Sequence, residues 1–184
     1  CILVSILAPS DFSERHFRDL QRGIVEEARR YKAAVAGGNL SAGPLSVTVT
    51  AVGCGEPGRL LRRSGARPGD EIWVTGSPGL ASIGLRALKS RPPAGGGACR
   101  PQAAPVSPAR TLARAIRAYK TPKARVREAL EIARRFRPTA MIDLSDGLSA
   151  DLGHVLDESS RERGRALGAI LNEASLASLP GLAA

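Results

Sequence analysis

Aromatic residues and long apolar runs are both scarce in this sequence. Aromatic side chains make up 3% of its 184 residues, so a hydrophobic core must be built mainly from Leu, Ile, Val and Ala. No stretch approaches the run of about 18 apolar residues that a membrane-spanning helix requires. The opening CILVSILAPSDF also lacks the basic start of a signal peptide. We therefore expect neither a membrane span nor a membrane partner.

Cysteine and histidine are also rare. Cys1, Cys54 and Cys99 are widely spaced and odd in number, which predicts neither a disulfide framework nor a metal site. This usage fits a reducing cytoplasm, so we expect a cytoplasmic protein. The two histidines, His16 and His154, lie within expected helices, with no ligand set at the right spacing beside them.

Methionine occurs once, at Met141, and the chain begins with Cys1. We therefore expect a fragment or a processed product rather than a chain that begins at its own start codon. At 184 residues the chain is long enough for one domain or two small ones.

The net charge of +10 is concentrated in one part of the chain. Residues 86–137 hold 14 basic and two acidic residues, whereas the remainder holds 13 basic and 15 acidic residues. A basic stretch permits a nucleic-acid-binding module on the helices expected within 110–137. Only Tyr119 and Phe136 could offer a stacking surface there, and stacking is a main contribution to single-strand binding. We therefore expect no nucleic-acid partner.

Hydrophobic periodicity predicts strands and helices in alternation. Short apolar or alternating runs predict strands at 1–9, 33–38, 44–55, 71–76, 139–145 and 165–172. Helical spacing predicts a first helix that is capped by Ser10 or Asp11 and ends near Tyr31. Further helices are predicted at 80–88, 111–119, 123–136 and 148–160. Residues 90–110 are rich in Pro, Gly and Ala, and we expect them to form a flexible insertion.

This order of elements predicts an α/β to α+β fold. The segment RRSGARPGD, with Gly65, Pro68 and Gly69, has the chemistry of a turn and favours a boundary near Asp70. We therefore expect two sub-domains, residues 1–69 and 70–184.

The segment MIDLSDGLSADLGHVL, residues 141–156, places Asp143 and Asp146 on either side of Ser145. A strand, a Ser-Asp-Gly turn and a helix would put Ser145 or Asp146 near a helix N-terminus, where both residue types are favoured caps. Capping does not account for Asp143 at the end of an apolar strand. The alternative is a divalent-cation site, in which Mg²⁺ bridges carboxylates and phosphate oxygens. The spacing alone leaves these two interpretations evenly balanced.

A second candidate site follows the strand expected at 33–38. Gly37 and Gly38 would let backbone N–H groups approach an anion, while Asn39 offers a carbonyl oxygen and Ser41 a hydroxyl group. A plain Gly-Gly turn is the favoured interpretation, because the spacing matches neither a lysine-containing phosphate loop nor a dinucleotide fingerprint.

Four stretches of the chain, in order, resemble the thiamine-monophosphate kinase family, within the superfamily that includes aminoimidazole ribonucleotide synthetase. They are GGNLSAGPLSVTVTAVG, RRSGARPGDEIWVTGSPGLASIGL, TPKARVREAL and TAMIDLSDGLSADLGHVL. The resemblance implies ATP-dependent phosphorylation of thiamine monophosphate to thiamine diphosphate, by direct in-line transfer assisted by several Mg²⁺ ions. It also implies a homodimer, with ATP in a cleft between an N-terminal nucleotide-binding domain and a C-terminal domain. Residues 1–69 and 70–184 would be parts of these domains.

The resemblance also implies roles for individual residues, and it assigns no catalytic side chain. Nucleotide contacts are expected at Gly38, Asn39, Arg63 and Ser145, and Mg²⁺ ligands at Asn39, Asp143 and Asp146. With the resemblance included, the pair of aspartates is interpreted as a metal site.

Two departures from the family pattern bear on activity. Asn39 stands where the family usually has aspartate. Asparagine keeps an oxygen ligand but lacks the negative charge, so one metal ion should bind more weakly. The chain also lacks the family's N-terminal acidic segment and its C-terminal substrate-binding segment, as if truncated at both ends. Two alternatives therefore stay open beside the kinase: a nucleotide-binding relative without turnover, and another synthetase of the superfamily.

Overall fold

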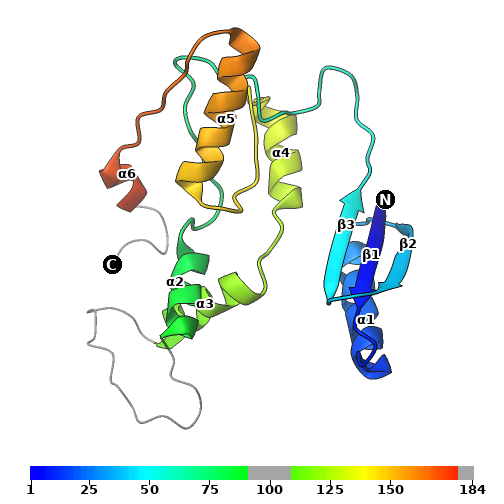
Figure 1. The fold of residues 1–184 in the computed structure, drawn as a ribbon. Coiled ribbons are helices and arrows are strands. Elements are labelled where there is room, and N and C mark those ends of the chain that lie inside the picture. The colour runs from blue at the N-terminus through cyan, green and yellow to red at the C-terminus, as the bar shows by residue number, and fades with distance from the viewer. Residues whose placement is uncertain (91–108, 178–184) are drawn as a thin grey trace. The chain divides into compact units, whose positions relative to one another are not determined.

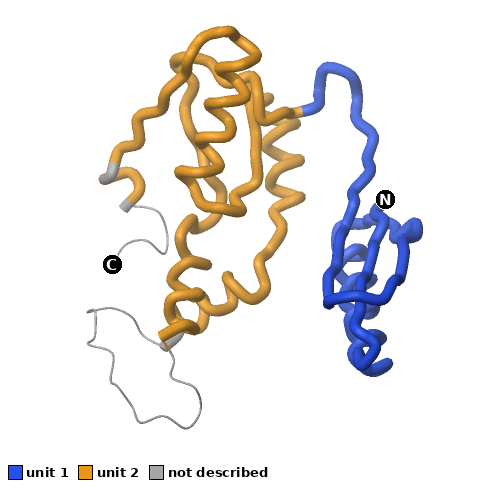
Figure 2. Tube along the Cα trace, viewed as in Figure 1, with its two compact units in different colours: residues 1–60 blue, residues 61–184 orange. Residues whose placement is uncertain are grey.

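A computed structural model describes residues 1–90 and 109–177 of the chain. It divides into two compact units, unit 1 (Cys1–Leu60) and unit 2 (Leu61–Ala184), which are coloured separately in Figure 2. The boundary expected after residue 69 lies within unit 2. The flexible insertion expected at 90–110 lies outside the described residues except at its two ends.

Unit 1 is built on a three-stranded sheet and one helix (Figure 1). Its elements are β1 (Ile2–Ala8), α1 (Glu14–Arg30), β2 (Val35–Ala42) and β3 (Ser46–Ala51). The strand order is β2-β1-β3, with β1 parallel to β2 and antiparallel to β3. Parallel neighbours need a crossover connection, which α1 supplies between β1 and β2.

The cap of α1 differs from the sequence prediction. Ser13 is the N-cap residue, and its side chain accepts a hydrogen bond from the backbone N–H of His16 at 3.3 Å. Ser10 and Asp11 lie in a preceding turn, which is closed by the backbone N–H of Phe12. The helix therefore begins only after this turn.

The Gly-Gly turn expected after the second strand is wrong. Gly37 and Gly38 lie inside β2, which continues to Ala42. Gly38 is paired with Val4 of β1, and a Cβ atom on Gly38 would lie 1.7 Å from the Val4 carbonyl oxygen. Glycine is needed at this position because any side chain would collide with the neighbouring backbone.

The regular elements of unit 2, among its described residues, are all helices. They are α2 (Leu80–Lys89), α3 (Ala109–Lys120), α4 (Val126–Phe136), α5 (Leu148–Arg163) and α6 (Glu173–Ala177). Helices α2 and α3 pack closely, since a Cβ atom on Gly84 of α2 would lie 2.1 Å from the carbonyl oxygen of Ala115 of α3. Gly84 and Ala115 are both buried, so small residues allow the two helix backbones to approach.

Three predicted strands of unit 2 are wrong: 71–76, 139–145 and 165–172 have no strand pairing within the described part of the chain. One backbone hydrogen bond, from the N–H of Met141 to the carbonyl of Arg62 at 2.9 Å, links the second of them to another segment. An apolar run becomes a strand only when a partner satisfies its row of N–H and C=O groups.

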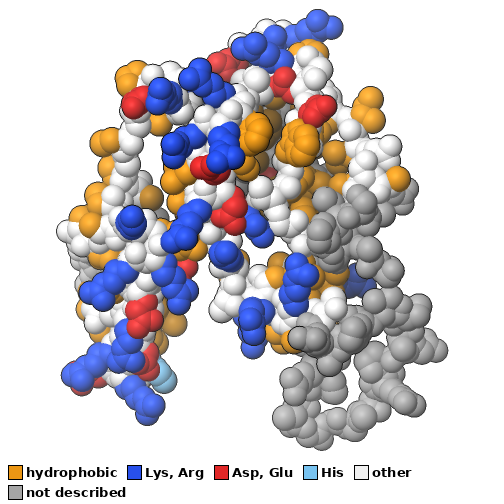
Figure 3. Space-filling view, turned by 180° about the vertical axis from the view of Figure 1, so that it is seen from behind, with side chains coloured by type: hydrophobic (Ala, Val, Ile, Leu, Met, Phe, Trp, Pro, Cys, Tyr) orange, Lys and Arg blue, Asp and Glu red, His pale blue; other side chains and the backbone are white. Residues whose placement is uncertain are grey.

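Among the residues whose burial the structure describes, few apolar side chains are buried in either unit. They are Val4, Ile6 and Ala28 in unit 1, and Leu80 and Ala115 in unit 2. Figure 3 shows hydrophobic side chains open to solvent, among basic and acidic ones, on the face that it draws.

The mixture of a small sheet and helices confirms the expected α/β to α+β class. Among the described residues, no helix is both long enough and apolar enough to cross a membrane.

Candidate functional site

The turn at residues 143–147 leads directly into α5. Three of its backbone N–H groups, those of Ser145, Asp146 and Gly147, donate hydrogen bonds to Oδ2 of Asp151, at 2.9, 3.1 and 3.1 Å. Asp151 lies in the first turn of α5 and is only 2% exposed. A buried carboxylate that accepts several N–H groups is a strong anchor, so this side chain fixes the shape of the turn.

The sequence prediction that Ser145 or Asp146 caps this helix is wrong. The N-cap residue is Gly147, whose φ of 113° lies in a region that favours glycine, and it makes no side-chain cap hydrogen bond. Asp151 takes over the capping function from inside the helix, where a negative charge also interacts favourably with the helix dipole. The backbone N–H groups of the turn are therefore occupied, and the turn offers side chains to a ligand.

Those side chains are available. Asp143, Ser145 and Asp146 are exposed. Within the part of the chain that the structure describes, neither the Asp143 nor the Asp146 carboxylate is recorded in an ion pair or a side-chain hydrogen bond. Free carboxylate oxygens are the ligands that Mg²⁺ prefers in proteins, so the turn has the chemistry of the expected metal site.

His154 approaches the same turn, although no ligand set was expected beside it from the sequence. Potential ligand atoms of Asp146, Asp151 and His154 all lie within 4.8 Å of one another. Oδ2 of Asp151 already accepts three N–H groups, so the exposed members of this group are Asp146 and His154. A spacing of three residues places Asp151 and His154 on one face of a helix, a signal that the sequence does carry.

The second group of site residues in unit 2 surrounds Arg63. The backbone N–H groups of Gly65 and Ala66 donate to Oγ of Ser159 on α5, at 3.1 and 3.0 Å. Arg62 and Arg63 are exposed, and neither is among the ion pairs of the described residues. Together with Ser64 and Glu158 they line an open hollow of about 320 Å³. Two unpaired guanidinium groups at one hollow suit an anion such as a phosphate.

Gly38 and Asn39 belong to unit 1. Asn39 is exposed in β2, and its Nδ2 donates a hydrogen bond to Oγ of Ser41 at 3.0 Å. This contact leaves the Asn39 carbonyl oxygen available as a ligand. Gly38 is explained by the close approach of β1, so its presence does not by itself indicate an anion site.

A further hydrogen bond links the 67–70 turn to Thr139, which lies in the segment before the 143–147 turn. Asp70 Oδ2 accepts hydrogen bonds from the Thr139 hydroxyl at 2.6 Å and from the Arg67 backbone N–H at 2.8 Å. These bonds, the Thr139 one first, stabilise the carboxylate and lower the pKa of Asp70 below its ordinary value.

Sequence reasoning missed Asp151 and Ser159, which hold the two groups in unit 2. An acidic residue in the first turn of a helix is a recognisable local signal, and it would have singled out Asp151. Ser159 lies 94 residues from Gly65 along the chain, and no local pattern predicts that contact.

Known proteins share both the sequence and the fold. The chain is 33% identical over 157 residues to the thiamine-monophosphate kinase of Escherichia coli strain K12. These residues make up 85% of this chain and 44% of that protein. A solved thiamine-monophosphate kinase from Stenotrophomonas maltophilia K279a is 31% identical, with a TM-score of 0.70 over 86% of this chain and 47% of that one. A solved structure described as AaThiL complexed with AMPPCP and TMP is 27% identical, with a TM-score of 0.65 over 86% and 46%. No family model matches the chain.

The chain thus spans less than half the length of these relatives. The likeness extends over most of this chain, in sequence and in fold, and is not confined to the short motifs that first indicated it. By sequence and by fold, the chain is therefore a relative of the thiamine-monophosphate kinases.

Proposed function

We propose that this protein is an ATP-dependent kinase that phosphorylates thiamine monophosphate to thiamine diphosphate. The observation that carries the proposal is the 143–147 turn, which presents two unpaired carboxylates in a chain 33% identical to a thiamine-monophosphate kinase. In the proposed reaction the terminal phosphoryl group of ATP passes to the phosphate of thiamine monophosphate, and ADP leaves.

The donor types of the proposed ligands fit Mg²⁺. The carboxylates of Asp143 and Asp146 in unit 2 are hard oxygen donors, and so, in unit 1, is the amide carbonyl of Asn39. When bound, Mg²⁺ would neutralise the charge of the phosphate oxygens during transfer. The Asn39 carbonyl is neutral, so it should bind Mg²⁺ more weakly than either aspartate carboxylate does.

The proposed nucleotide contacts are Gly38, Asn39, Arg63 and Ser145. The unpaired guanidinium group of Arg63 is suited to a phosphate, and the exposed hydroxyl of Ser145 can donate to a phosphate oxygen. The solved neighbour described as complexed with AMPPCP, an ATP analogue, and with TMP supports both substrates.

A homodimeric assembly and a cytoplasmic location complete the proposal. Both rest on the family resemblance, and the location also rests on the scattered cysteines. Neither a membrane nor a nucleic acid is proposed as a partner. Sedimentation at several protein concentrations tests the assembly, since a monomer at every concentration would exclude the dimer.

The second candidate is a nucleotide-binding relative without turnover. The neutral Asn39 favours it, because a missing charge at a metal ligand weakens the ion that transfer needs. Another synthetase of the same superfamily is not favoured, because the relatives above are all thiamine-monophosphate kinases or described as ThiL.

One assay separates these candidates. ADP formation is measured with ATP and Mg²⁺, with and without thiamine monophosphate, and ATP binding is measured in parallel. The kinase predicts ADP that depends on thiamine monophosphate and is lost with Asp143→Asn by on the order of tenfold or more, about 1.4 kcal/mol in the barrier. Asp157→Asn, an exposed acid elsewhere on α5, is the matched control and should retain activity. ATP binding without ADP formation would instead support the second candidate.

A further inference from the structure

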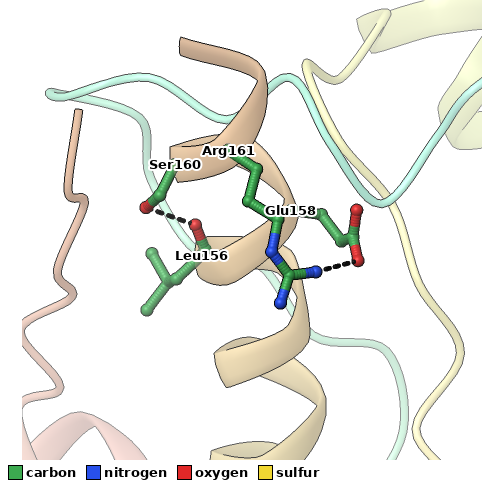
Figure 4. Close-up of polar contacts among 4 residues, drawn as sticks. All are labelled: Leu156, Glu158, Ser160 and Arg161. Carbon is green, nitrogen blue, oxygen red and sulfur yellow. Dashed lines mark hydrogen bonds and ion pairs between the residues drawn. The ribbon is translucent and has the colours of Figure 1, made fainter. Parts of the chain in front are cut away.

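α5 anchors three other segments of unit 2 through its own polar side chains. Asp151 holds the 145–147 turn, Ser159 holds Gly65 and Ala66, and Ser160 accepts a hydrogen bond from the backbone N–H of Leu167 at 2.9 Å. Ser160 also donates to the Leu156 carbonyl at 2.7 Å, as drawn in Figure 4. Two of these segments contain residues of the proposed nucleotide site.

Ser159 is placed to act on the segment that carries Arg63. It is fully buried, with 0% exposure, and its Oγ accepts two backbone N–H groups from adjacent residues. A buried hydroxyl with two such partners has little freedom to move, because each bond lost would leave a part-buried N–H without its acceptor.

The 62–66 segment is fixed on both sides of Arg63. Before it, the carbonyl of Arg62 accepts the N–H of Met141 at 2.9 Å, and after it come the two bonds to Ser159. Gly65 has a φ of +117°, and a Cβ atom there would lie 2.4 Å from the Thr139 carbonyl oxygen. The backbone beneath Arg63 is therefore confined, while its guanidinium group has no ion-pair partner among the described residues.

Glu158 could have neutralised that guanidinium group, since it lines the same hollow. It pairs instead with Arg161 on its own helix, at 2.9 Å (Figure 4). The hollow therefore keeps the positive charge of Arg62 and Arg63 for a ligand.

α5 also sets the separation of the two anchored segments. Asp151 and Ser159 lie eight residues apart on one continuous helix, a rise of about 12 Å at 1.5 Å per residue. A helix is stiff over this length, so the 62–66 segment and the 143–147 turn are held at a defined spacing.

We infer that Ser159 is a positioning residue for nucleotide binding: through Gly65 and Ala66 it places the Arg63 guanidinium group for the phosphates of ATP. This role rests on the proposed function. Ser159 itself does not touch the nucleotide, so its effect on binding must pass through Arg63.

The test combines amide exchange with ATP affinity in Ser159→Ala. Exchange at Gly65 and Ala66 should accelerate, exchange at residues 145–147 should not change, and ATP should bind about fivefold more weakly, the equivalent of roughly 1 kcal/mol. Ser159→Thr keeps the hydroxyl group and should restore both values. Ser160→Ala is the matched control: it should expose Leu167 to exchange and leave ATP affinity unchanged.

A second arm tests the route through Arg63. In an Arg63→Ala background, Ser159→Ala should cause no further loss of ATP affinity, because coupled residues are not additive. Equal losses in both backgrounds would overturn the positioning role, as would unchanged exchange at Gly65 and Ala66. If the unaltered chain binds ATP and Ser159→Ala binds it equally well, only the positioning role fails. If the unaltered chain binds no ATP, the proposed function fails and the positioning role with it.

Discussion

The two units hold their candidate site residues by different means. In unit 1, Gly38 and Asn39 are part of β2, which is paired with β1 along its length. In unit 2, the turn around Asp146 and the segment around Arg63 have no strand partners. The turn is held by the buried Asp151 side chain of α5, and the segment by the buried Ser159 side chain of α5 together with one backbone hydrogen bond to Met141.

This difference decides where the molecule is sensitive to a single substitution. A strand is held by many backbone hydrogen bonds, so no neighbouring side chain controls its position, and only a steric conflict within the sheet should displace it. A turn held by one buried acceptor loses its position when that acceptor is removed. Single substitutions in each unit therefore test this contrast.

Removal of the Asp151 carboxylate should have the largest effect. Asp151→Ala removes a buried carboxylate and leaves three backbone N–H groups without their acceptor, and we expect unit 2 to lose about 3 kcal/mol of stability. The free energy of unfolding is measured by urea titration followed by circular dichroism. Asp157→Ala, an exposed acid on the same helix, should change stability by less than about 0.5 kcal/mol. If Asp151→Ala lowers the free energy of unfolding no more than Asp157→Ala does, the turn does not depend on this one side chain, and the proposed difference between the units is wrong.

Steric conflict in unit 1 should come next. Gly38→Ala would place a Cβ atom 1.7 Å from the Val4 carbonyl oxygen, so β1 and β2 must separate, at a cost of about 2–3 kcal/mol. Gly23→Ala is the matched control, since Gly23 lies within α1 and a Cβ there meets nothing within 4 Å. It should stabilise α1 by about 0.5–1 kcal/mol. If Gly38→Ala and Gly23→Ala change the free energy of unfolding by the same amount, the close contact between β1 and β2 at Gly38 does not limit the side chain there.

Charge at the proposed metal ligands should have a smaller effect, visible in binding. Asn39→Asp adds a carboxylate in unit 1 and should tighten Mg²⁺-dependent ATP binding, while Asp143→Asn in unit 2 should weaken it. Each change is expected to be about tenfold, or 1.4 kcal/mol. Calorimetric titration of ATP at several Mg²⁺ concentrations and fixed ionic strength measures both.

The two variants separate the contributions of the units. An effect of Asp143→Asn without one of Asn39→Asp would make Asn39 an ordinary strand residue. No effect of either variant on the Mg²⁺ dependence would remove the proposed metal site from the 143–147 turn.

The smallest effect concerns pH and the contact between Thr139 and Asp70. The pKa of Asp70 is lowered in the folded chain, chiefly by the Thr139 hydrogen bond. Its contribution to stability is therefore present above the ordinary carboxyl pKa of about 4 and is lost as the pH falls through the lowered value. Thr139→Val should raise the pKa of Asp70 and reduce that acid-side loss, as measured by NMR titration of Asp70 and by unfolding at neutral and acid pH. Thr75→Val, an exposed threonine in the same unit, should leave the Asp70 titration unchanged.

Helices were the elements that sequence reasoning predicted well. The helices expected at 80–88, 123–136 and 148–160 correspond to α2 (Leu80–Lys89), α4 (Val126–Phe136) and α5 (Leu148–Arg163). Helical hydrogen bonds join residues four apart, so the pattern that specifies them lies within each segment. Strands at 71–76, 139–145 and 165–172 were predicted from equally apolar runs, but a strand depends on a partner that such a run does not specify.

The amino-acid sequence is enough to define the chemistry of the candidate site: two aspartates beside a serine, an arginine after a second arginine, and an asparagine after two glycines, all readable as short motifs. Tertiary structure decided how these groups are held. Asp151 turns toward the backbone of 145–147, and Ser159 reaches Gly65 across 94 residues of chain. The physical reason is that a residue type states which bonds a side chain can form, whereas its partner depends on which distant backbone groups the packed fold brings within hydrogen-bonding distance.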